Sequence, residues 1–183
     1  MPYIILDRDG VINHDSDYYI KNPDEWLPIS GSLDAIAKLN ANGYEVFIVT
    51  NQSGVARGHY DLAMLENIHK KLHATLAEAG GKIKEIFFCP HHPDEACECR
   101  KPQPGLIYKI QKKYNLDLTQ TYFIGDSKVD IQAAKEAGCK PILVLTGNGL
   151  KTIENFPDAA LVPQFKDLAH AVDAIITQKQ GSL

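Results

Sequence analysis

The sequence contains no long hydrophobic segment. Uninterrupted apolar runs reach only four or five residues, as from Ile142 to Leu145, whereas a membrane-spanning helix needs roughly 20. The N-terminal residues Met1 to Leu6 include no basic stretch and no small-residue cleavage site, so no export signal is visible. We therefore expect a cytoplasmic protein that has no membrane partner.

The sequence also lacks an excess of basic residues. Its 19 lysines and arginines stand against 23 acidic residues, which gives a formal net charge of −4. Without a global positive field, the chain has no general attraction for nucleic acid or anionic lipid. Nucleic acid is therefore not an expected partner, and any recognition of phosphate must be local.

No internal repeat, low-complexity tract or linker interrupts the 183 residues. Apolar residues make up 44% of the chain and charged residues 23%, the proportions of an ordinary globular protein. A chain of this length buries about 70% of its unfolded surface area on folding, so it can form a substantial core. We expect one domain that spans residues 1–183 and exists as a monomer.

Short apolar segments alternate with longer segments of helical period. Several of the short segments are apolar at successive positions, which is typical of strands that are covered on both faces. The expected strands are Tyr3 to Leu6, Glu45 to Val49, Glu85 to Phe88, Tyr122 to Ile124, Pro141 to Leu145 and Ala159 to Val162.

Five helices are expected between these strands and after them, because apolar residues recur every three or four positions and serine, proline or glycine marks several ends. The expected helices contain Leu33 to Ala37 with a stop at Gly43, Leu62 to Leu76, Leu106 to Ile110 after Pro104, Ile131 to Ala137 between Ser127 and Gly138, and Phe165 to Ile175. This alternation predicts an α/β fold with a single Rossmann-like, doubly wound parallel sheet. In such sheets ligands bind beyond the carboxyl ends of the strands, so chemistry is sought in the residues just after each strand.

Two carboxylates follow the first expected strand, in the string Asp7-Arg8-Asp9-Gly10. Aspartates at i and i+2 in a tight turn can hold a hard divalent cation, or can divide the roles of nucleophile and acid/base. An Asx turn at the end of a strand is the structural alternative.

A polar turn follows the second expected strand. A hydroxyl and free backbone amides at this position can donate hydrogen bonds to a phosphoryl oxygen. Polar turns follow most strands, so the position of this one is more informative than its composition. The turn consists of Thr50, Asn51, Gln52 and Ser53, and Arg57 lies close enough in the sequence to join it.

Three cysteines and a histidine are clustered after the third expected strand. Cys89, His91, Cys97 and Cys99 have the spacing C-x-H-x5-C-x-C, which matches a closed tetrahedral zinc site. A disulfide would leave one of these thiols unpaired and would not explain the histidine, whereas His92 could replace His91 as a ligand. The fourth cysteine, Cys139, stands apart and is expected to be a small buried hydrophobic residue.

Further charged residues follow the cysteines and the fourth expected strand. Lys101 comes two residues after Cys99, and a surface lysine is usually only a solvated charge. Asp126 ends the fourth strand, where it can complete an oxygen site for Mg²⁺ with the first pair of aspartates. Asp130 lies in the first turn of the next helix, where stabilisation by the helix dipole explains it nearly as well as function does.

The joint occurrence of these motifs, in this order, resembles the phosphatases of the haloacid dehalogenase superfamily. The motifs are DRDGV, the strand-end threonine, the lysine about fifty residues later and GDSKVD. The strings DRDGVIN, TNQSGVARG, CPHHP and CECRKPQPG further resemble the branch that acts on heptose 1,7-bisphosphate. The resemblance implies a zinc loop at residues 89–99, inserted after the third strand, and no large cap domain.

The resemblance also implies a role for each matching residue. Asp7 would be the nucleophile that becomes an aspartyl phosphate, Asp9 the acid and then the base, and Thr50 and Lys101 the groups that hold phosphoryl oxygens. Mg²⁺ would be held by Asp7, Asp126 and the backbone of Asp9, and structural Zn²⁺ by the cysteine and histidine ligands. The implied substrate-binding residues are Asp15, Ser16, Asp17, Tyr18, Asn51, Gln52, Ser53, Arg57 and Arg100, with Arg100 as the partner of a second phosphate.

The activity implied is hydrolysis of the C7 phosphate of heptose 1,7-bisphosphate, in the supply of heptose for lipopolysaccharide or for nucleotide-activated heptose. Histidinol-phosphate phosphatases have a similar zinc loop and are the alternative within the superfamily. A receiver domain is an alternative of another class, since it also places acidic residues, a threonine and a lysine at strand ends. A receiver accepts phosphate on a central strand, however, whereas the aspartate pair here follows the first strand.

Overall fold

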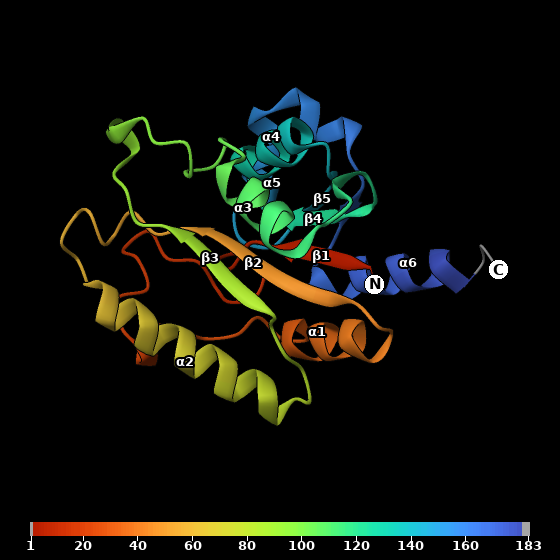
Figure 1. Cartoon of the computed structure of the whole chain (residues 1–183), viewed down its shortest axis with the longest axis horizontal. Helices are drawn as coiled ribbons and strands as arrows, with labels where there is room; N and C mark the ends of the chain where they lie inside the picture. The colour runs from red at the N-terminus through yellow and green to blue at the C-terminus, as the bar shows by residue number, and fades with distance from the viewer. Residues whose placement is uncertain (1, 181–183) are drawn as a thin grey trace.

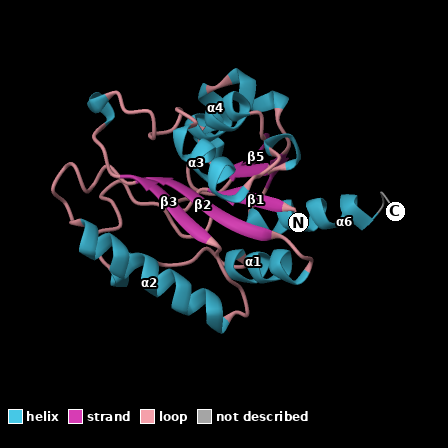
Figure 2. Cartoon of the chain, viewed as in Figure 1, coloured by secondary structure: helices cyan, strands magenta, loops and turns pink. Residues whose placement is uncertain are grey.

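A computed structural model describes residues 2–180 of the chain. Its described part contains one sheet of six parallel strands with helices on both faces (Figures 1 and 2). The strands are β1 (Tyr3–Leu6), β2 (Glu45–Asn51), β3 (Glu85–Cys89), β4 (Tyr122–Gly125), β5 (Lys140–Val144) and β6 (Gln164–Phe165). Their order across the sheet is β3-β2-β1-β4-β5-β6. The expected doubly wound parallel sheet is therefore confirmed.

Within residues 2–180, six α-helices connect or follow the strands. They are α1 (Ser32–Ala41), α2 (Leu62–Glu78), α3 (Gly105–Tyr114), α4 (Lys128–Ala137), α5 (Gly149–Asn155) and α6 (Leu168–Gln180). Short 3₁₀ turns lie at Pro23–Glu25, Pro93–Glu95, Leu118–Gln120 and Pro157–Leu161. Within residues 2–180 there is no large cap domain, and no helix has the length and apolar character needed to cross a bilayer.

The two faces of the sheet bury different sets of helices. Ile4 and Leu6 of β1 point into a core shared with α1, α2 and α6, whereas Ile5 points into a core shared with α3 and α4. Successive side chains of a strand point to opposite faces, so an entirely apolar strand requires cover on both sides. Figure 1 shows the two helical layers on either side of the sheet.

The order of the strands reverses direction between β1 and β4. From β1 the chain runs to β2 and then to β3, whereas β4, β5 and β6 extend the sheet from the other edge of β1. The backbone amide of Asp7 donates to the carbonyl of Ile124 over 2.9 Å, which ties the end of β1 to β4. The connections diverge above this point, so a crevice opens there at the carboxyl ends of the strands.

The expected strand from Ala159 to Val162 is wrong. Residues Pro157–Leu161 form a 3₁₀ turn, and the edge strand is the short β6, whose Phe165 pairs with Val144. Ala159 and Val162 are three positions apart and both pack against Ile131 and Leu143. Their apolar character therefore reflects one buried side of a helical turn, in which Pro157 occupies a favourable first position.

The C-terminal region differs from expectation in two further details. Helix α6 begins at Leu168, because Asp167 accepts a hydrogen bond from the backbone amide of His170 over 3.0 Å, and Phe165 belongs to β6. Helix α5 was not expected from the sequence. It has seven residues, of which only Gly149 and Thr152 are buried, so its apolar pattern is weak.

Candidate active site

Three buried carboxylates meet at the crevice between β1 and β4. Asp7 follows β1, Asp126 follows β4 and Asp130 lies in the first turn of α4. One oxygen of each carboxylate lies within 4.8 Å of the corresponding oxygens of the other two. Parallel strands bring Asp7 and Asp126 together although they are more than a hundred residues apart in the sequence.

Lys101 places a buried positive charge between two of these carboxylates. Its Nζ lies 2.9 Å from Oδ1 of Asp7 and 2.6 Å from Oδ1 of Asp130. It also donates to the carbonyl oxygen of Val49 over 2.9 Å. Burial opposes the charged form of the lysine, but the charges of Asp130 and Asp7 outweigh burial and raise its pKa. Lys101 is therefore a buried ammonium group and not a solvated surface charge.

Asn51 holds the backbone of Lys101 at the end of β2. The side-chain amide of Asn51 donates to the carbonyl of Lys101 over 3.1 Å, and its oxygen accepts from the amide of Lys101 over 3.0 Å. This reciprocal pair fixes the loop that carries the lysine. The amide group of Asn51, expected to bind substrate, is thus engaged in positioning Lys101.

The carboxylate cluster carries more negative charge than Lys101 can balance. Burial raises the pKa of Asp7, and the charges of Asp130 and Asp9 raise it further against the opposing effect of Lys101. Burial also raises the pKa of Asp126, followed by the charges of Asp130 and Asp7. Carboxylate and carbonyl oxygens are the ligands that Mg²⁺ prefers, so these residues suit a divalent cation that would relieve their repulsion.

Two glycines allow close approach to Asp126. A Cβ atom at Gly10 or Gly147 would overlap Oδ2 of Asp126, and both glycines have positive φ angles, +80° and +55°. The same oxygen accepts a hydrogen bond from the backbone amide of Asn148 over 2.7 Å. These contacts fix the direction in which the Asp126 carboxylate enters the crevice.

Asp130 is a site residue that sequence reasoning did not select. Its Oδ2 accepts from the backbone amide and the hydroxyl of Ser127 over 3.0 and 2.6 Å, while Oδ1 faces Lys101. Both of its oxygens are therefore engaged with protein groups. The pattern GDSKVD could have indicated this residue. Its second aspartate lies one helical turn after the first, so its side chain can reach back to the end of β4.

Asp9 is firmly held beside this cluster by hydrogen bonds to its carboxylate. Its two oxygens accept hydrogen bonds from Arg8, Asn13 and Gln52, with distances between 2.8 and 3.0 Å. Burial works to raise the pKa of Asp9, but the charge of Arg8 and these hydrogen bonds together lower it. The side chain of Asp9 stays outside the group of three carboxylates, so any contact between Asp9 and a metal ion there falls to its backbone.

A cavity of about 390 Å³ opens above the carboxylates. Eight of the nine expected substrate-binding residues line it, whereas Tyr18 does not and is 81% exposed. Its neighbour Tyr19 lines the cavity instead and packs against His59 of the loop after β2, with tilted rings whose centroids are 4.7 Å apart. The eight residues are Asp15, Ser16, Asp17, Asn51, Gln52, Ser53, Arg57 and Arg100.

The two expected arginines differ in their surroundings. Arg57 is exposed at the rim of the cavity, while Nη1 of Arg100 is buried and has no hydrogen-bond partner among the described residues. A buried guanidinium nitrogen that lacks a partner is costly, so an acceptor from a ligand would suit this position. Arg100 therefore fits the recognition of a second phosphate, because guanidinium groups bind phosphate oxygens in pairs.

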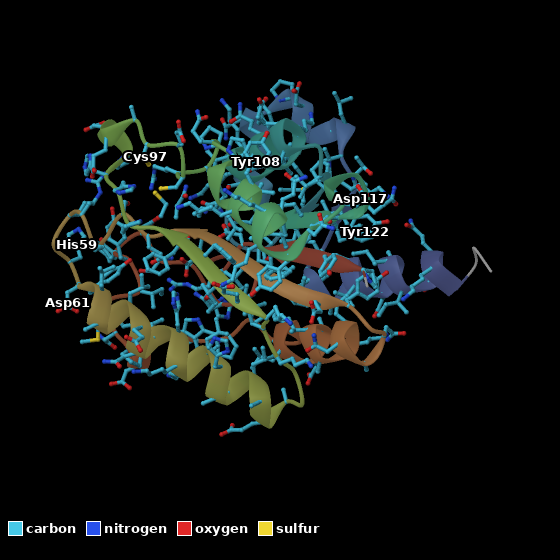
Figure 3. All side chains as sticks on the ribbon, in the orientation of Figure 1. His59, Asp61, Cys97, Tyr108, Asp117 and Tyr122 are labelled. Atoms are coloured by element: carbon cyan, nitrogen blue, oxygen red, sulfur yellow. The ribbon has the colours of Figure 1, made fainter. Side chains whose placement is uncertain are left out.

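The cysteine cluster lies in the loop after β3, where Figure 3 shows Cys97. Sγ of Cys99 is 3.0 Å from Sγ of Cys89 and 3.5 Å from Sγ of Cys97, and Nδ1 of His91 is 3.1 Å from Sγ of Cys99. All four ligand atoms lie within 4.8 Å of one another. Sulfur ligands of a tetrahedral zinc ion are roughly 3.8 Å apart, so the cluster can hold such an ion.

The structure distinguishes between the two neighbouring histidines. His91 points into the thiol cluster, whereas Nδ1 of His92 accepts a hydrogen bond from the backbone amide of Asp94 and caps the following 3₁₀ turn. His91 is therefore the imidazole that completes the cluster. Cys139 is buried and lies outside the cluster, as expected, and burial raises its pKa to about 12.

Comparison with known proteins identifies the class to which this fold and site belong. A model of HAD-hydrolase-like proteins matches residues 98–171. A Pseudomonas putida protein named D-glycero-beta-D-manno-heptose-1,7-bisphosphate 7-phosphatase is 52% identical over 170 residues, which are 92% of this chain and 96% of that protein. The chain belongs to the haloacid dehalogenase-like hydrolase family, as a phosphoric monoester hydrolase.

Solved structures show the same likeness within this family. The crystal structure of D,D-heptose 1,7-bisphosphate phosphatase from Bordetella bronchiseptica, complexed with magnesium and phosphate, has 48% sequence identity and a TM-score of 0.93, and the match covers 97% of this chain and 99% of that one. The enzyme of the same name from Burkholderia thailandensis has 36% identity and a TM-score of 0.75, with 96% and 99% covered. The resemblance found in the sequence is thus confirmed over nearly the whole chain.

Proposed function

We propose that this protein is a Mg²⁺-dependent phosphatase that removes the C7 phosphate of D-glycero-D-manno-heptose 1,7-bisphosphate. The observation that carries the proposal is the convergence of Asp7, Thr50, Lys101 and Asp126 on one open cavity. The relatives that bear this name support the choice of substrate. The product would supply the heptose precursors of lipopolysaccharide or of nucleotide-activated heptose.

Asp7 is the nucleophile in this proposal. Both hydrogen bonds that its carboxylate accepts among the described residues, from the amide of Arg8 and from Lys101, reach Oδ1. We therefore assign Oδ2 as the atom that forms a bond to phosphorus while the bond between phosphorus and the sugar oxygen breaks. Asp9 enters this step protonated and delivers its proton to the departing sugar oxygen, which leaves as an alcohol and leaves Asp9 ionised for the next step.

The second step regenerates the enzyme. The ionised Asp9 takes a proton from water, and the resulting hydroxide attacks phosphorus of the aspartyl phosphate. The bond from phosphorus to Oδ2 of Asp7 then breaks, so inorganic phosphate leaves and the carboxylate is restored. The hydrogen bonds that hold Asp9 as an anion suit this role as a base.

The remaining residues manage the charge of the phosphoryl group. Lys101 and the hydroxyl of Thr50 hold its oxygens as charge redistributes, in the manner of an oxyanion hole. Magnesium, held by the carboxylates of Asp7 and Asp126 and the backbone carbonyl of Asp9, would supply positive charge that screens the repulsion between carboxylate and phosphate. These groups would together offset the negative charge that accumulates when the Asp7 carboxylate approaches the phosphate of the substrate.

A zinc ion held by the cysteine cluster would be structural. Three thiolates and one imidazole would supply all four ligands of such an ion, so the zinc would not provide a reactive water. Cys99 precedes Lys101 by two residues, and an extended chain spans at most about 3.5 Å per residue. The cluster therefore fixes the start of the segment that places Lys101 and Arg100 at the cavity.

The proposal is tested by comparing the turnover of heptose 1,7-bisphosphate and histidinol phosphate in the presence of Mg²⁺. We expect the bisphosphate to be hydrolysed with the higher kcat/KM, and ³¹P spectra to show that the C7 phosphate is removed. Asp7→Asn, prepared in the same way, controls for contaminating phosphatases. Equal or better turnover of histidinol phosphate would refute the substrate assignment, and self-phosphorylation without turnover would indicate a receiver.

A further inference from the structure

A buried arginine lies directly beneath the active-site aspartates. Arg8 is fully buried, although it stands between Asp7 and Asp9 in the sequence. Its Nε and Nη2 donate three hydrogen bonds to the Asp9 carboxylate over 2.9 to 3.0 Å. The position of the Asp9 carboxylate therefore depends on where the guanidinium group is held.

The far side of this guanidinium is held by a histidine. Nη1 of Arg8 lies 3.2 Å from Nε2 of His69. Arginine can only donate hydrogen bonds, so Nε2 of His69 must accept, and the imidazole must be neutral with its proton on Nδ1. Burial lowers the pKa of His69 to about 3, and the positive charge of Arg8 acts in the same direction. The imidazole is thus a permanent acceptor at working pH.

The location of His69 is unusual for a polar residue. Within α2, all of which the structure describes, the buried positions are Leu65, Ile68, His69, Leu72 and Leu76. Four of these are aliphatic and form the ordinary apolar stripe of a helix that packs on a sheet. Packing alone would be satisfied by another aliphatic side chain at residue 69, so the histidine points to a requirement for its acceptor nitrogen.

Gln52 supplies the second support of the same group. Its Oε1 accepts from Nη2 of Arg8 over 3.2 Å and from the hydroxyl of Tyr60 over 2.7 Å, while its Nε2 donates to Asp9 over 2.8 Å. Arg8 is thereby held between Gln52 and His69, and Asp9 is held by Arg8 and Gln52. The chain of contacts runs from α2, through the guanidinium, to the carboxylate at the cavity.

We propose that His69 is a positioning residue, which fixes Arg8 and through it the carboxylate of Asp9 for proton transfer. The inference rests on the proposed function, because it requires Asp9 to act as acid and base. Without the acceptor on His69, a buried N–H group of Arg8 has no partner, and the guanidinium turns toward another acceptor. The three hydrogen bonds to Asp9 then carry the carboxylate away from the leaving oxygen.

The proposal makes a prediction about leaving groups. A sugar alkoxide is a poor leaving group and needs the proton from Asp9, whereas a nitrophenolate departs readily without one. Loss of positioning should therefore slow hydrolysis of a sugar phosphate more than hydrolysis of p-nitrophenyl phosphate. A general loss of folding or of metal would slow both reactions to the same extent.

The experiment compares His69→Leu and His69→Gln with the wild type on heptose 1,7-bisphosphate and p-nitrophenyl phosphate. His69→Leu should lower kcat about 30-fold for the sugar phosphate but no more than about threefold for the aryl phosphate, since a positioned acid contributes about 10²–10⁴-fold. His69→Gln retains an acceptor oxygen and should stay within about threefold of the wild type on both substrates. His69→Met, which keeps volume but lacks a strong acceptor, serves if His69→Leu does not fold.

Leu72→Val is the matched control, because Leu72 is fully buried on the same face of α2. It should change the two rates equally. Equal losses with both substrates in His69→Leu or His69→Met, or failure of glutamine to restore the ratio, would overturn the positioning role. A wild-type protein that prefers another sugar phosphate would refute the proposed substrate, yet the same comparison on that ester would still test His69. Inactivity on every phosphate ester would overturn both proposals.

Discussion

The two side-chain clusters that could hold a metal ion are built in different ways. The carboxylates of Asp7, Asp126 and Asp130 come from distant parts of the sequence and are brought together by β1, β4 and α4. The thiols and imidazole of the other cluster lie within the eleven residues from Cys89 to Cys99. One cluster is therefore a product of the whole sheet, and the other is local.

The clusters also differ in what holds them in place. The carboxylates are buried and repel one another. The strands of the sheet fix their backbone positions, and the charge of Lys101 offsets part of the repulsion. Cys97 and Cys99 are only partly buried, in a loop whose regular structure is one 3₁₀ turn. A metal ion bound by the carboxylates would relieve their repulsion, whereas one bound by the thiols would tie together a loop that has little regular structure of its own.

The largest expected effect is the loss of catalysis when the sheet-built cluster is changed. Asp7→Asn should reduce turnover at least about 10⁴-fold, because the attacking oxygen is lost. The fold should persist, since the substitution removes one of the repelling charges. Initial rates, mass spectrometry for bound phosphate and thermal unfolding of the same preparation would check this.

Asp9→Asn is the control for this prediction. It keeps the nucleophile but loses the proton donor, so an activated aryl phosphate should still phosphorylate Asp7 to some extent. A phosphorylated Asp7→Asn protein would show that a different residue is the nucleophile.

A smaller effect is expected from Asp130→Asn. This variant weakens the contact that holds Lys101 and should lower turnover about 10²-fold, the usual result of disturbing one group that stabilises a developing charge. Asp34→Asn is the matched control, because Asp34 also lies in the first turn of a helix but is exposed. Similar kinetics for both variants would favour a helix-dipole role for Asp130.

Disruption of the cysteine and histidine cluster should affect both the binding of zinc and the order of the loop after β3. Cys99→Ser should lose zinc and lower turnover about tenfold, because the cluster positions the segment that carries Lys101. Loss of a group that only orients a functional side chain typically lowers activity about 10–100-fold. Most of the sheet should stay folded by circular dichroism, and excess Mg²⁺ should not restore activity. Zinc content and turnover are measured on one sample.

Cys139→Ser tests whether the effect belongs to the cluster, since Cys139 is a buried thiol outside it. We expect this variant to keep its zinc. A zinc-free Cys99→Ser protein with full activity would refute the coupling, and a zinc-bound but inactive one would indicate a direct role for the cysteine at the substrate.

The smallest effect concerns the stability of the protein in acid. It tests whether Arg8 and His69 are already in contact in the folded protein before substrate binds. His69 has a pKa of about 3 in the folded protein against 6.5 in the unfolded chain. Below about pH 6.5 the unfolded chain therefore binds a proton that the folded protein does not, and stability falls as pH falls toward 3. Between pH 7 and 4.5 this effect amounts to about 2–3 kcal/mol.

His69→Gln has no group that titrates at this position. From pH 7 to 4.5 the variant should therefore lose about 2–3 kcal/mol less free energy of unfolding than the wild type. Urea unfolding at the two pH values measures this difference. An equal loss in both proteins would mean that folding does not lower the pKa of His69, which would contradict its role as a neutral acceptor for Arg8.

The local clusters of residues were accessible from the sequence. The cysteine spacing predicted a cluster that the structure forms, and the choice of His91 over His92 agrees with the geometry. The strand-end positions of Asp7, Thr50 and Asp126 followed from apolar periodicity and the topology of parallel sheets. These signals depend on neighbours in the sequence, so the sequence alone reveals them.

Other features depend on partners that are distant in the sequence. The role of Asp130 rests on its contact with Lys101, and that of Gln52 on its contacts with Arg8, Asp9 and Tyr60. Gln52 and Asn51 were expected to contact substrate, yet the structure engages their amides with other protein groups. A polar turn has the same composition whether its side chains bind substrate or other protein groups. The sequence therefore does not distinguish these two roles.

The sequence by itself determined the alternation of elements, the ends of most strands and the members of the cysteine and histidine cluster. Each of these follows from local chemistry: side-chain periodicity, turn residues and ligand spacing. The tertiary structure alone decided that Arg8 and His69 are buried together and that residues 157–161 form a turn and not a strand. These outcomes depend on which groups share the low-dielectric interior, because a buried charge must find its partners there and an apolar run packs against whatever surface the rest of the chain presents.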